Sequence, residues 1–387
     1  MTDFAWEPTQ EYVERANVTR LMRAHGIGTI DELRARSVAD ISWYWDAVVR
    51  DLGIPFAQPY EQVLDDSQGI QWCKWFVGGH VNLTSACVDR WTGAPELADR
   101  PALIAEAEDG VVRTLTYGDL AREVDALAAA LRADGVSKGD TIGVFMPMVA
   151  EAVVAAYAIA KIGAVYLPIF SGFAASAIAS RLQDAEARVV LTADGTWRRG
   201  KHGAMKPTCD EAVAQCPTVR RVVMLERLGI DVPMTPGRDA TWADFTAGHT
   251  GTVEAEDTGS EDVFMIAYTS GTTGRPKGAV HVHGGFLVKI ASEVAYQTDL
   301  HPGEVFYWVT DMGWIMGPLS MVGSHALGAA MVMYEGAPDF PEPDRVWASV
   351  ERHRVAMLGV SPTLIRALKT QGDEWPAAHD LSSLRIL

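Results

Sequence analysis

Cysteine is scarce in this sequence, and its few copies lack any spacing typical of a metal or redox site. The four residues, Cys73, Cys87, Cys209 and Cys216, form no Cys-x-x-Cys pair. Such an arrangement indicates reduced thiols with a structural role, as in a cytosolic protein, rather than a disulfide framework.

Long apolar runs and an excess of positive charge are also missing. No uninterrupted apolar stretch reaches the roughly 20 residues that a membrane-spanning helix needs. Residues 1–4 lack the basic and apolar regions of a secretion signal. The net charge of −17 argues against non-specific nucleic-acid binding, which requires a basic surface. We therefore expect a soluble, cytoplasmic protein with neither a membrane nor a nucleic-acid partner.

The hydrophobic content, by contrast, is ample for a packed core. Of the 387 residues 48% are hydrophobic and 21% are charged, which favours a large α/β body or two or more domains. Apolar runs predict strands at 103–107, 111–114, 141–146, 164–169, 189–192, 219–225, 263–269, 305–309, 330–334 and 355–360. Helical patterning occurs at 11–25, 30–36, 42–52, 116–133, 150–162, 176–183, 210–215, 283–296, 319–327, 344–353 and 362–369.

The alternation of these elements predicts a mainly parallel sheet structure covered by helices on both faces. We expect three parts: an aromatic-rich N-terminal cap at 1–95, a first α/β subdomain at 96–250 and a second at 251–387. The polar stretch at 227–262 is interpreted as the connection between the two subdomains.

One stretch, Tyr268–Gly278, concentrates the residues that a polyphosphate requires. It combines hydroxyl side chains, three glycines and Lys277 within eleven residues, directly after a predicted buried strand. Glycines allow backbone N–H groups to point at anionic oxygens, and the lysine supplies a positive charge. We also expect the helix predicted from about His283 to present its positive end to the same place. The alternative is a polar surface loop without a ligand.

This stretch is not a Walker A loop, because Pro276 precedes the lysine and Gly278 follows it. It resembles instead the signature [ST]-[SG]-G-[ST]-[ST]-G-x-P-K-G of AMP-forming acyl-CoA synthetases and their adenylating relatives, which residues 269–278 match at every position. The aromatic run at 71–91 likewise resembles the N-terminal segment of acetyl-CoA-synthetase-type enzymes.

The resemblance implies the large N-terminal body of the adenylate-forming fold, with two mainly parallel sheets. It also implies ATP, Mg²⁺ and coenzyme A as cofactors, and a small carboxylic acid as substrate. Thr269 and Lys277 become the catalytic residues. The ATP phosphates would be held by Thr269, Ser270, Gly271, Thr272, Thr273, Gly274 and Lys277. No protein residue is predicted as a metal ligand, and an oligomer is compatible with the sequence.

The segment Thr310–Gly317 resembles the Gly-Trp segment of acetyl- and propionyl-CoA synthetases. In that family the tryptophan gates the pantetheine channel and the next two residues line the acyl pocket. The resemblance thus implies that Trp314 is the gate and that Ile315 and Met316 contact the substrate. Met316 replaces the threonine typical of acetate enzymes, which changes the depth and polarity of the pocket.

A basic cluster at Trp197–Lys201 is conspicuous in so acidic a chain. It follows a predicted strand and is a candidate for holding the 3′-phosphate of coenzyme A; the resemblance implies that Arg198 and Lys201 make this contact. The resemblance adds Phe170, Ser171 and Gly172 as a loop against the coenzyme A adenine. The alternative for the basic cluster is a solvated turn.

Two histidines, His281 and His283, follow the phosphate loop. Their spacing is compatible with metal binding, but no carboxylate or cysteine accompanies them, so we predict a packing role near the acyl pocket.

Several segments of the family do not occur in this sequence, which stops at Leu387 within a predicted strand. These are a Gly-Glu-Pro adenine segment, a Thr-Gly-Asp ribose motif and a C-terminal lid with the catalytic lysine. The sequence therefore predicts the N-terminal portion of an AMP-forming ligase that converts a short-chain carboxylate to its CoA thioester, with little activity alone. The alternatives are a truncated, non-catalytic nucleotide- or acyl-binding protein and an adenylating enzyme whose acceptor is a carrier protein.

Overall fold

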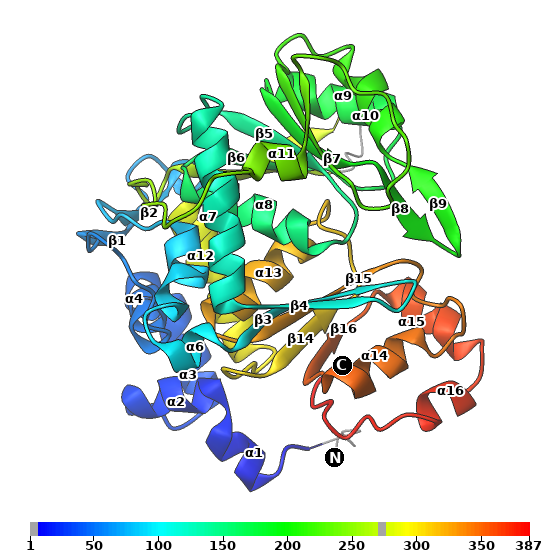
Figure 1. Ribbon diagram of the computed structural model, residues 1–387. Coiled ribbons are helices and arrows are strands. Elements are labelled where there is room, and N and C mark those ends of the chain that lie inside the picture. The colour runs from blue at the N-terminus through cyan, green and yellow to red at the C-terminus, as the bar shows by residue number, and fades with distance from the viewer. Residues whose placement is uncertain (1–6, 270–275) are drawn as a thin grey trace.

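Two β-sheets, with helices packed between them and on their outer faces, make up the body of the chain (Figure 1). The structure is a computed structural model and describes residues 7–269 and 276–387. No helix within these ranges is long and apolar enough to cross a membrane.

The first sheet has seven strands: β5 (Thr141–Phe145), β6 (Val165–Pro168), β7 (Val189–Ala193), β10 (Arg221–Leu225), β11 (Asp239–Thr241), β12 (Val263–Thr269) and β13 (Lys277–Val282). Their order is β11-β10-β7-β5-β6-β12-β13. All neighbours are parallel except β12 and β13, which form an antiparallel hairpin at one edge. Every residue of β5 and β7 is buried, as expected for strands covered on both faces.

The second sheet has five strands: β3 (Pro101–Ala107), β4 (Val112–Thr116), β14 (Val305–Trp308), β15 (Ala330–Glu335) and β16 (Met357–Gly359). Their order is β16-β14-β15-β3-β4, and only the β3–β4 hairpin is antiparallel. The prediction of two mainly parallel sheets covered by helices is therefore confirmed.

Strands from distant parts of the chain complete each sheet. The β3–β4 hairpin joins the second sheet beside β15, whereas β12 joins the first sheet beside β6. Consequently residues 96–250 and 251–387 each contribute strands to both sheets, and the division into two subdomains at about residue 250 stays a prediction.

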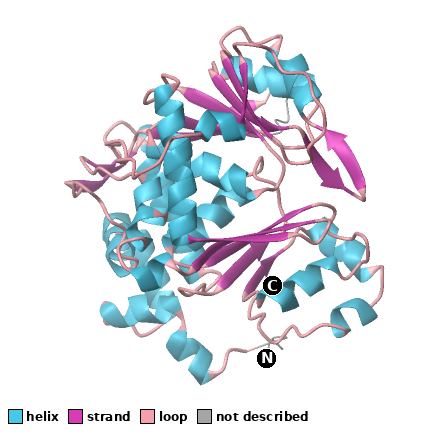
Figure 2. Cartoon of the chain, in the orientation of Figure 1, coloured by secondary structure: helices cyan, strands magenta, loops and turns pink. Residues whose placement is uncertain are grey.

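Helices fill the space between the two sheets, as Figure 2 shows. These are α7 (Tyr117–Ala133), α8 (Ala150–Lys161), α12 (His283–Tyr296) and α13 (Met316–Ala326). Their buried residues form one apolar cluster with residues of both sheets. Helix α8 is buried at every position except Glu151, because it lies between the sheets. Its many alanines let neighbouring elements approach closely.

Other helices cover the outer faces. α9 (Ala175–Asp184) and α10 (Lys206–Val213) pack on the first sheet, and α14 (Arg345–His353) and α15 (Pro362–Lys369) pack on the second. The remaining short elements are α6 (Pro95–Ala98), α11 (Trp242–Thr246), α16 (Glu374–Ala377), and the 3₁₀ turns η1 (Ile70–Trp72) and η2 (Asp89–Trp91).

The N-terminal cap contributes α1 (Gln10–Arg15), α2 (Asn17–Ala24), α3 (Ile30–Ala39), α4 (Ile41–Asp51), α5 (Leu83–Cys87) and the hairpin of β1 (Gln62–Asp65) and β2 (Lys74–Val77). The sequence predicts one helix over 11–25, and this is wrong, because the chain leaves the helical conformation at Ala16. The β1–β2 hairpin was also not predicted, since its strands are only four residues long.

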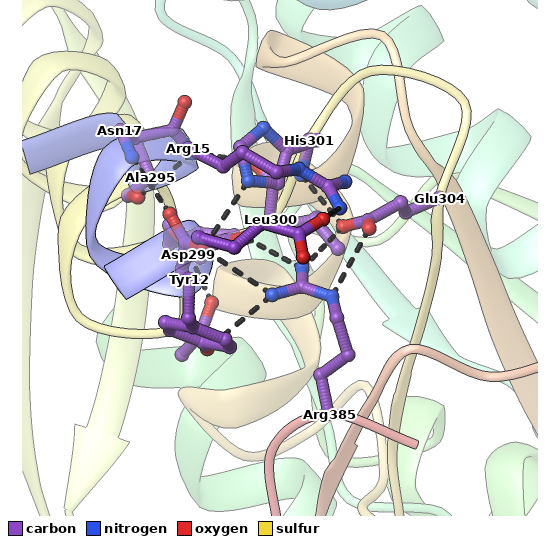
Figure 3. A network of polar contacts seen from close by, with 12 residues as sticks. Tyr12, Arg15, Asn17, Ala295, Asp299, Leu300, His301, Glu304 and Arg385 are labelled. Carbon is purple, nitrogen blue, oxygen red and sulfur yellow. Dashed lines mark hydrogen bonds and ion pairs between the residues drawn. The ribbon is translucent and has the colours of Figure 1, made fainter. Parts of the chain in front are cut away.

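Tertiary contacts explain the break between α1 and α2 (Figure 3). The backbone N–H of Asn17 donates to Asp299 at 2.8 Å, and its side-chain amide donates to the carbonyls of Ala295 and Leu300. Arg385, from the last residues of the chain, reaches Asp299 and Glu304 in the same network. A continuous helix could not offer its N–H group at Asn17 to Asp299.

Candidate functional site

The predicted phosphate loop is carried by the β12–β13 hairpin at the edge of the first sheet. Thr269 and Lys277 are opposite residues in the hairpin register and both are exposed, so the strands bring these two predicted residues together. The predicted phosphate contacts Ser270, Gly271, Thr272, Thr273 and Gly274 lie outside the described residues.

Helix α12 does not point its N-terminus at this loop, which corrects the sequence prediction. After the loop the chain first returns along β13, so α12 begins beside the start of β12, where the N–H of His283 donates to the carbonyl of Asp262 at 3.0 Å. The loop and the helix N-terminus thus lie at opposite ends of a six-residue strand. A favourable helix dipole at the phosphates is excluded for α12.

A second part of the site forms where the loop after β6 meets the turn after β14. The hydroxyl of Ser171 donates to Asp311 at 2.6 Å, and the N–H of Gly313 donates to the other oxygen of the same carboxylate at 2.7 Å. Phe170 packs against Trp314 with ring centroids 5.3 Å apart. The structure therefore brings together Phe170, Ser171 and Trp314, which the sequence assigned separately.

The approach of these two segments leaves no room for a side chain at Gly313. A Cβ atom there would overlap the backbone nitrogen of Phe170 and lie 2.7 Å from the carbonyl carbon of Ile169. Gly172 is also required in the present arrangement, because a Cβ would come within 2.7 Å of the Phe170 ring.

Asp311 is the buried charge at this junction, with 9% of its surface exposed. Burial raises the pKa of Asp311 above its usual range, while the hydrogen bonds from Ser171 and Gly313 and the positive charge of Arg198 act in the opposite direction. Asp311 was not predicted as a site residue, although it is the acidic residue that precedes the Gly-Trp pair in the segment singled out by its resemblance.

The three predicted substrate residues follow directly on this junction. Trp314 and Ile315 are each 41% exposed, which is high for large apolar side chains, and Met316 is half-buried at the start of α13. Trp314 faces the Phe170 loop, whereas Ile315 borders an apolar cavity against α12 and the N-terminal cap. Trp314 and Ile315 thus face different sides of the site.

A line of contacting aromatic and guanidinium side chains connects this junction to the phosphate hairpin. The guanidinium of Arg181, on α9, lies 4.2 Å from the ring centre of Phe173 and 5.6 Å from that of Tyr268. Phe173 in turn contacts Phe170 and Trp314. Burial lowers the pKa of Arg181. Sequence reasoning placed Arg181 only within a predicted helix, because its pairing with aromatic rings depends on tertiary structure.

The basic cluster forms a second hairpin, β8 (Gly195–Arg198) and β9 (Lys201–Ala204), which was not predicted. Arg198 and Lys201 are opposite residues in its register and both are exposed. Arg199 and Gly200 form its two-residue turn with φ angles of 51° and 68°, as a tight hairpin turn requires. Among the described residues the charged ends of Arg198 and Lys201 have no ion pair or hydrogen bond, whereas the neighbouring Arg199 pairs with Asp339 at 2.7 Å.

The β8–β9 hairpin lies beside the end of β15 (Figure 1), and two buried carboxylates, Glu108 and Glu335, hold it there. Glu108 accepts the backbone N–H groups of Arg199 and Gly200 at 2.8 and 2.7 Å, and Glu335 accepts that of Trp197 at 3.1 Å. The orientation of the basic pair therefore depends on residues far away in the sequence, which the composition of the cluster could not indicate.

The two histidines take packing positions, in keeping with the prediction. The ring of His281 is half-buried against Phe286 at 5.1 Å, and burial lowers its pKa. His283 is fully buried, its Nδ1 accepts the N–H of Leu83 at 3.2 Å, and burial lowers its pKa to about 4. Within the described ranges no group of three His, Cys, Asp or Glu residues is arranged to hold a metal ion. All four cysteines are free thiols.

Comparison with known proteins defines the class to which this fold and site belong. A model of the AMP-binding enzyme family matches residues 91–387, and a model of the acetyl-coenzyme A synthetase N-terminus matches residues 30–87. The chain therefore belongs to the AMP-binding enzyme family.

Individual relatives show which members of this family the chain is similar to. The acetyl-coenzyme A synthetase of Pasteurella multocida (strain Pm70) is 40% identical over 99% of this chain and 57% of that protein. That of Methanothrix thermoacetophila is 38% identical over 98% of this chain and 57% of that protein. The solved structure of acetoacetyl-CoA synthetase from Streptomyces lividans has a TM-score of 0.91 at 31% identity, over 98% of this chain and 59% of that one.

The chain thus spans less than two thirds of the length of these relatives. The sequence-based resemblance, including its restriction to an N-terminal portion, is confirmed.

Proposed function

We propose that this chain is the substrate- and nucleotide-binding part of an AMP-forming acyl-CoA ligase. In the first step a carboxylate oxygen attacks the α-phosphorus of ATP, which forms an acyl-AMP and releases pyrophosphate. In the second step the thiol of coenzyme A attacks the acyl carbon, which forms the thioester and releases AMP. The acyl group is short, and the protein acts in the cytoplasm.

The observation that carries this proposal is the convergence of the candidate residues at the carboxyl ends of parallel strands. Thr269 ends β12, the Phe170–Gly172 loop follows β6, and the turn with Trp314 follows β14. Ligands of α/β proteins bind in the crevice outside such strand ends. The contact between Gly313 and Phe170 brings the strand ends of the two sheets to one place.

Each group of residues has a role in this reaction. Lys277, Thr269 and the loop between them bind the outer phosphates of ATP and stabilise the charge of the leaving pyrophosphate. Mg²⁺ would neutralise the same charge, held mainly by phosphate oxygens and water rather than by a protein cage. Trp314 separates the acyl side, formed by Ile315 and Met316, from the coenzyme A side.

The coenzyme A side is formed by Phe170, Ser171, Gly172, Arg198 and Lys201. The exposed, opposed charges of Arg198 and Lys201 suit a terminal phosphate, and the aromatic loop suits the adenine ring. A protein that passed its acyl group to a carrier protein would have no use for a site that recognises this 3′-phosphate.

Carboxylate-dependent exchange of labelled pyrophosphate into ATP tests the proposal. The assay uses acetate to hexanoate and benzoate, with this chain and with the full-length gene product. Exchange by the full-length protein is expected with at least one acid. Binding of ATP without exchange for any acid would favour a non-catalytic binding protein.

Lys277→Ala is the matching variant for the phosphate loop. Lys277 is exposed at the first position of β13, so truncation of its side chain should not disturb the sheet. We expect ATP affinity to fall about tenfold, as for loss of one charge-assisted hydrogen bond, with AMP affinity nearly unchanged. Lys369→Ala, an exposed lysine on α15, is the control. Equal loss for ATP and AMP would contradict the assignment of Lys277 to the outer phosphates.

A further inference from the structure

An apolar cavity of about 390 Å³ lies between the N-terminal cap and the body, next to the acyl side of the site. Its walls come from three regions: Trp45, Trp75 and Phe76 of the cap, Val280 of β13 and Phe286 of α12, and Ile315 of the segment after Trp314. We call it the cap recess. A volume of this size is at the lower end of ligand-binding cavities, about 300–1,000 Å³, and far exceeds an acetate methyl group.

The walls of the cap recess are fixed by packing rather than left open by chance. Trp45 and Trp75 contact edge to face at 6.1 Å, Phe76 is buried, and His281 packs against Phe286 at 5.1 Å. The opening of the recess, by contrast, carries exposed apolar side chains, with Val280 58% and Ile315 41% exposed. A rigid apolar floor with an apolar rim is the form of a small-molecule site.

The few polar groups of the recess favour an uncharged ligand over a nucleotide. Burial lowers the pKa of His281, so its ring is neutral at pH 7. The ammonium of Lys289 is already paired with Glu293 at 2.8 Å. No other ionisable side chain lines it among the residues described. The occupant is therefore an uncharged hydrocarbon group.

The position of Ile315, which lines the recess and directly follows Trp314, indicates which hydrocarbon group this is. Ile315 directly follows Trp314, whose ring packs on the coenzyme A side, and it points to the recess instead. A carboxylate that reacts beside Trp314 would extend its tail past Ile315 into the recess. We propose that the cap recess holds the distal end of the acyl substrate, the terminal carbons of an unbranched short-chain acid of about four to six carbons. This inference rests on the proposed function and specifies its substrate class.

Filling the recess tests the proposal in the full-length protein. Val280→Trp places a large ring at the rim, on an exposed strand position that tolerates aromatic residues. Because each methylene in an apolar pocket is worth about 10- to 200-fold in kcat/KM, we expect the hexanoate-to-acetate ratio in pyrophosphate exchange to fall about 30-fold or more. The acetate value should fall much less than the hexanoate value, because acetate does not reach the recess. Val38→Trp, exposed on α3 away from the recess, should leave both unchanged.

A second variant changes the ratio in the opposite direction. Trp75→Leu enlarges the recess, and we expect it to raise the relative rate for acids longer than hexanoate. If Val280→Trp lowers activity for every acid and thermal melting shows a disturbed fold, the Trp75→Leu variant still tests the proposal.

The outcomes separate this inference from the proposed function. Absence of exchange by the unsubstituted protein with any acid would overturn both. Exchange in which neither variant alters chain-length preference would overturn the cap recess alone. Loss of self-association in Val280→Trp with unchanged preference would assign the recess to a contact between copies and also overturn the proposal.

Discussion

The turn at Asp311–Trp314 and the tip of the β8–β9 hairpin belong to one site but are held in different ways. The turn is fixed from all sides: Gly313 abuts the backbone at Phe170, and the Asp311 carboxylate is buried and accepts two hydrogen bonds. At the hairpin tip, Glu108 and Glu335 hold the backbone and Asp339 holds the Arg199 side chain, while Arg198 and Lys201 are exposed to solvent.

The two regions therefore recognise substrates differently: the turn through its shape, and the hairpin tip through its charge. A gate that divides two substrates needs a fixed backbone, and the close approach of Gly313 to Phe170 supplies it for Trp314. A phosphate at the end of a long cofactor needs only charge within reach, and flexible side chains on a rigid backbone supply it. Substitutions should therefore have large, all-or-none effects at the turn and small, salt-dependent effects at the hairpin.

The largest effect is expected at Gly313. Gly313→Val would force the loop after β6 away from the turn, because the new side chain overlaps backbone atoms that cannot rotate aside. We expect a loss of about 2–4 kcal/mol in the free energy of unfolding, measured by urea denaturation, and loss of thioester formation. Gly93→Ala is the control, since its Cβ meets nothing within 4 Å. A Gly313→Val protein with unchanged stability would show that the turn is not held by packing.

The next effect concerns the charge of Asp311. Asp311→Ala leaves the Ser171 hydroxyl and the Gly313 N–H without their acceptor, and should lower the free energy of unfolding by about 2 kcal/mol. Asp311→Asn retains the shape and can still bond both groups, so its loss should be smaller.

The pH dependence distinguishes the charge from the hydrogen bonds. Since burial raises the pKa of Asp311, the folded protein binds this proton more tightly than the unfolded chain. The stability contributed by the site is therefore full below the ordinary aspartate pKa and falls as pH rises through the raised value. Asp311→Asn should remove this fall in urea unfolding as the pH is raised from below the ordinary aspartate pKa. An Asn variant with the same pH slope as the unsubstituted protein would refute the raised pKa.

The contrast between the two regions also explains how much the sequence could predict. The phosphate motif at 269–278 and the Trp314 segment were recognisable because they are contiguous and specify residue types. The alternation of strands and helices predicted the parallel sheets, since buried strands and amphipathic helices differ in period. The start of α7 could also be predicted from neighbouring residues, because Thr116 and Asp119 cap it in a reciprocal pair.

What escaped prediction depends on contacts between distant residues. Glu108 and Glu335 define the basic hairpin from 91 and 138 residues away along the chain. Asp311 and Arg181 look like ordinary turn and helix residues until Ser171, Phe173 and Tyr268 are placed beside them. The position of α12 was misjudged because the short run 277–282 was not recognised as a strand that carries the chain back.

The smallest effects are expected at the hairpin tip, and they test its assignment most specifically. Arg198→Ala or Lys201→Ala in the full-length protein should raise KM for coenzyme A about five- to tenfold, since an exposed charge contributes about 1 kcal/mol. The KM for dephospho-coenzyme A, which lacks the 3′-phosphate, should not change. Lys369→Ala again serves as the control, and the rate of pyrophosphate exchange should be the same in all variants.

Ionic strength then separates a phosphate contact from a structural role. The screening length shortens from about 10 Å at 0.1 M salt to about 3 Å at 1 M, so added salt should raise KM for coenzyme A in the unsubstituted protein. In the double variant Arg198→Ala, Lys201→Ala this increase should be much weaker, because the charges that salt screens are gone. KM for the acid should respond to salt in neither protein, since the recess beside Ile315 offers no unpaired charge. If dephospho-coenzyme A loses affinity as strongly as coenzyme A, the basic pair does not read the 3′-phosphate, and the hairpin is only a solvated turn.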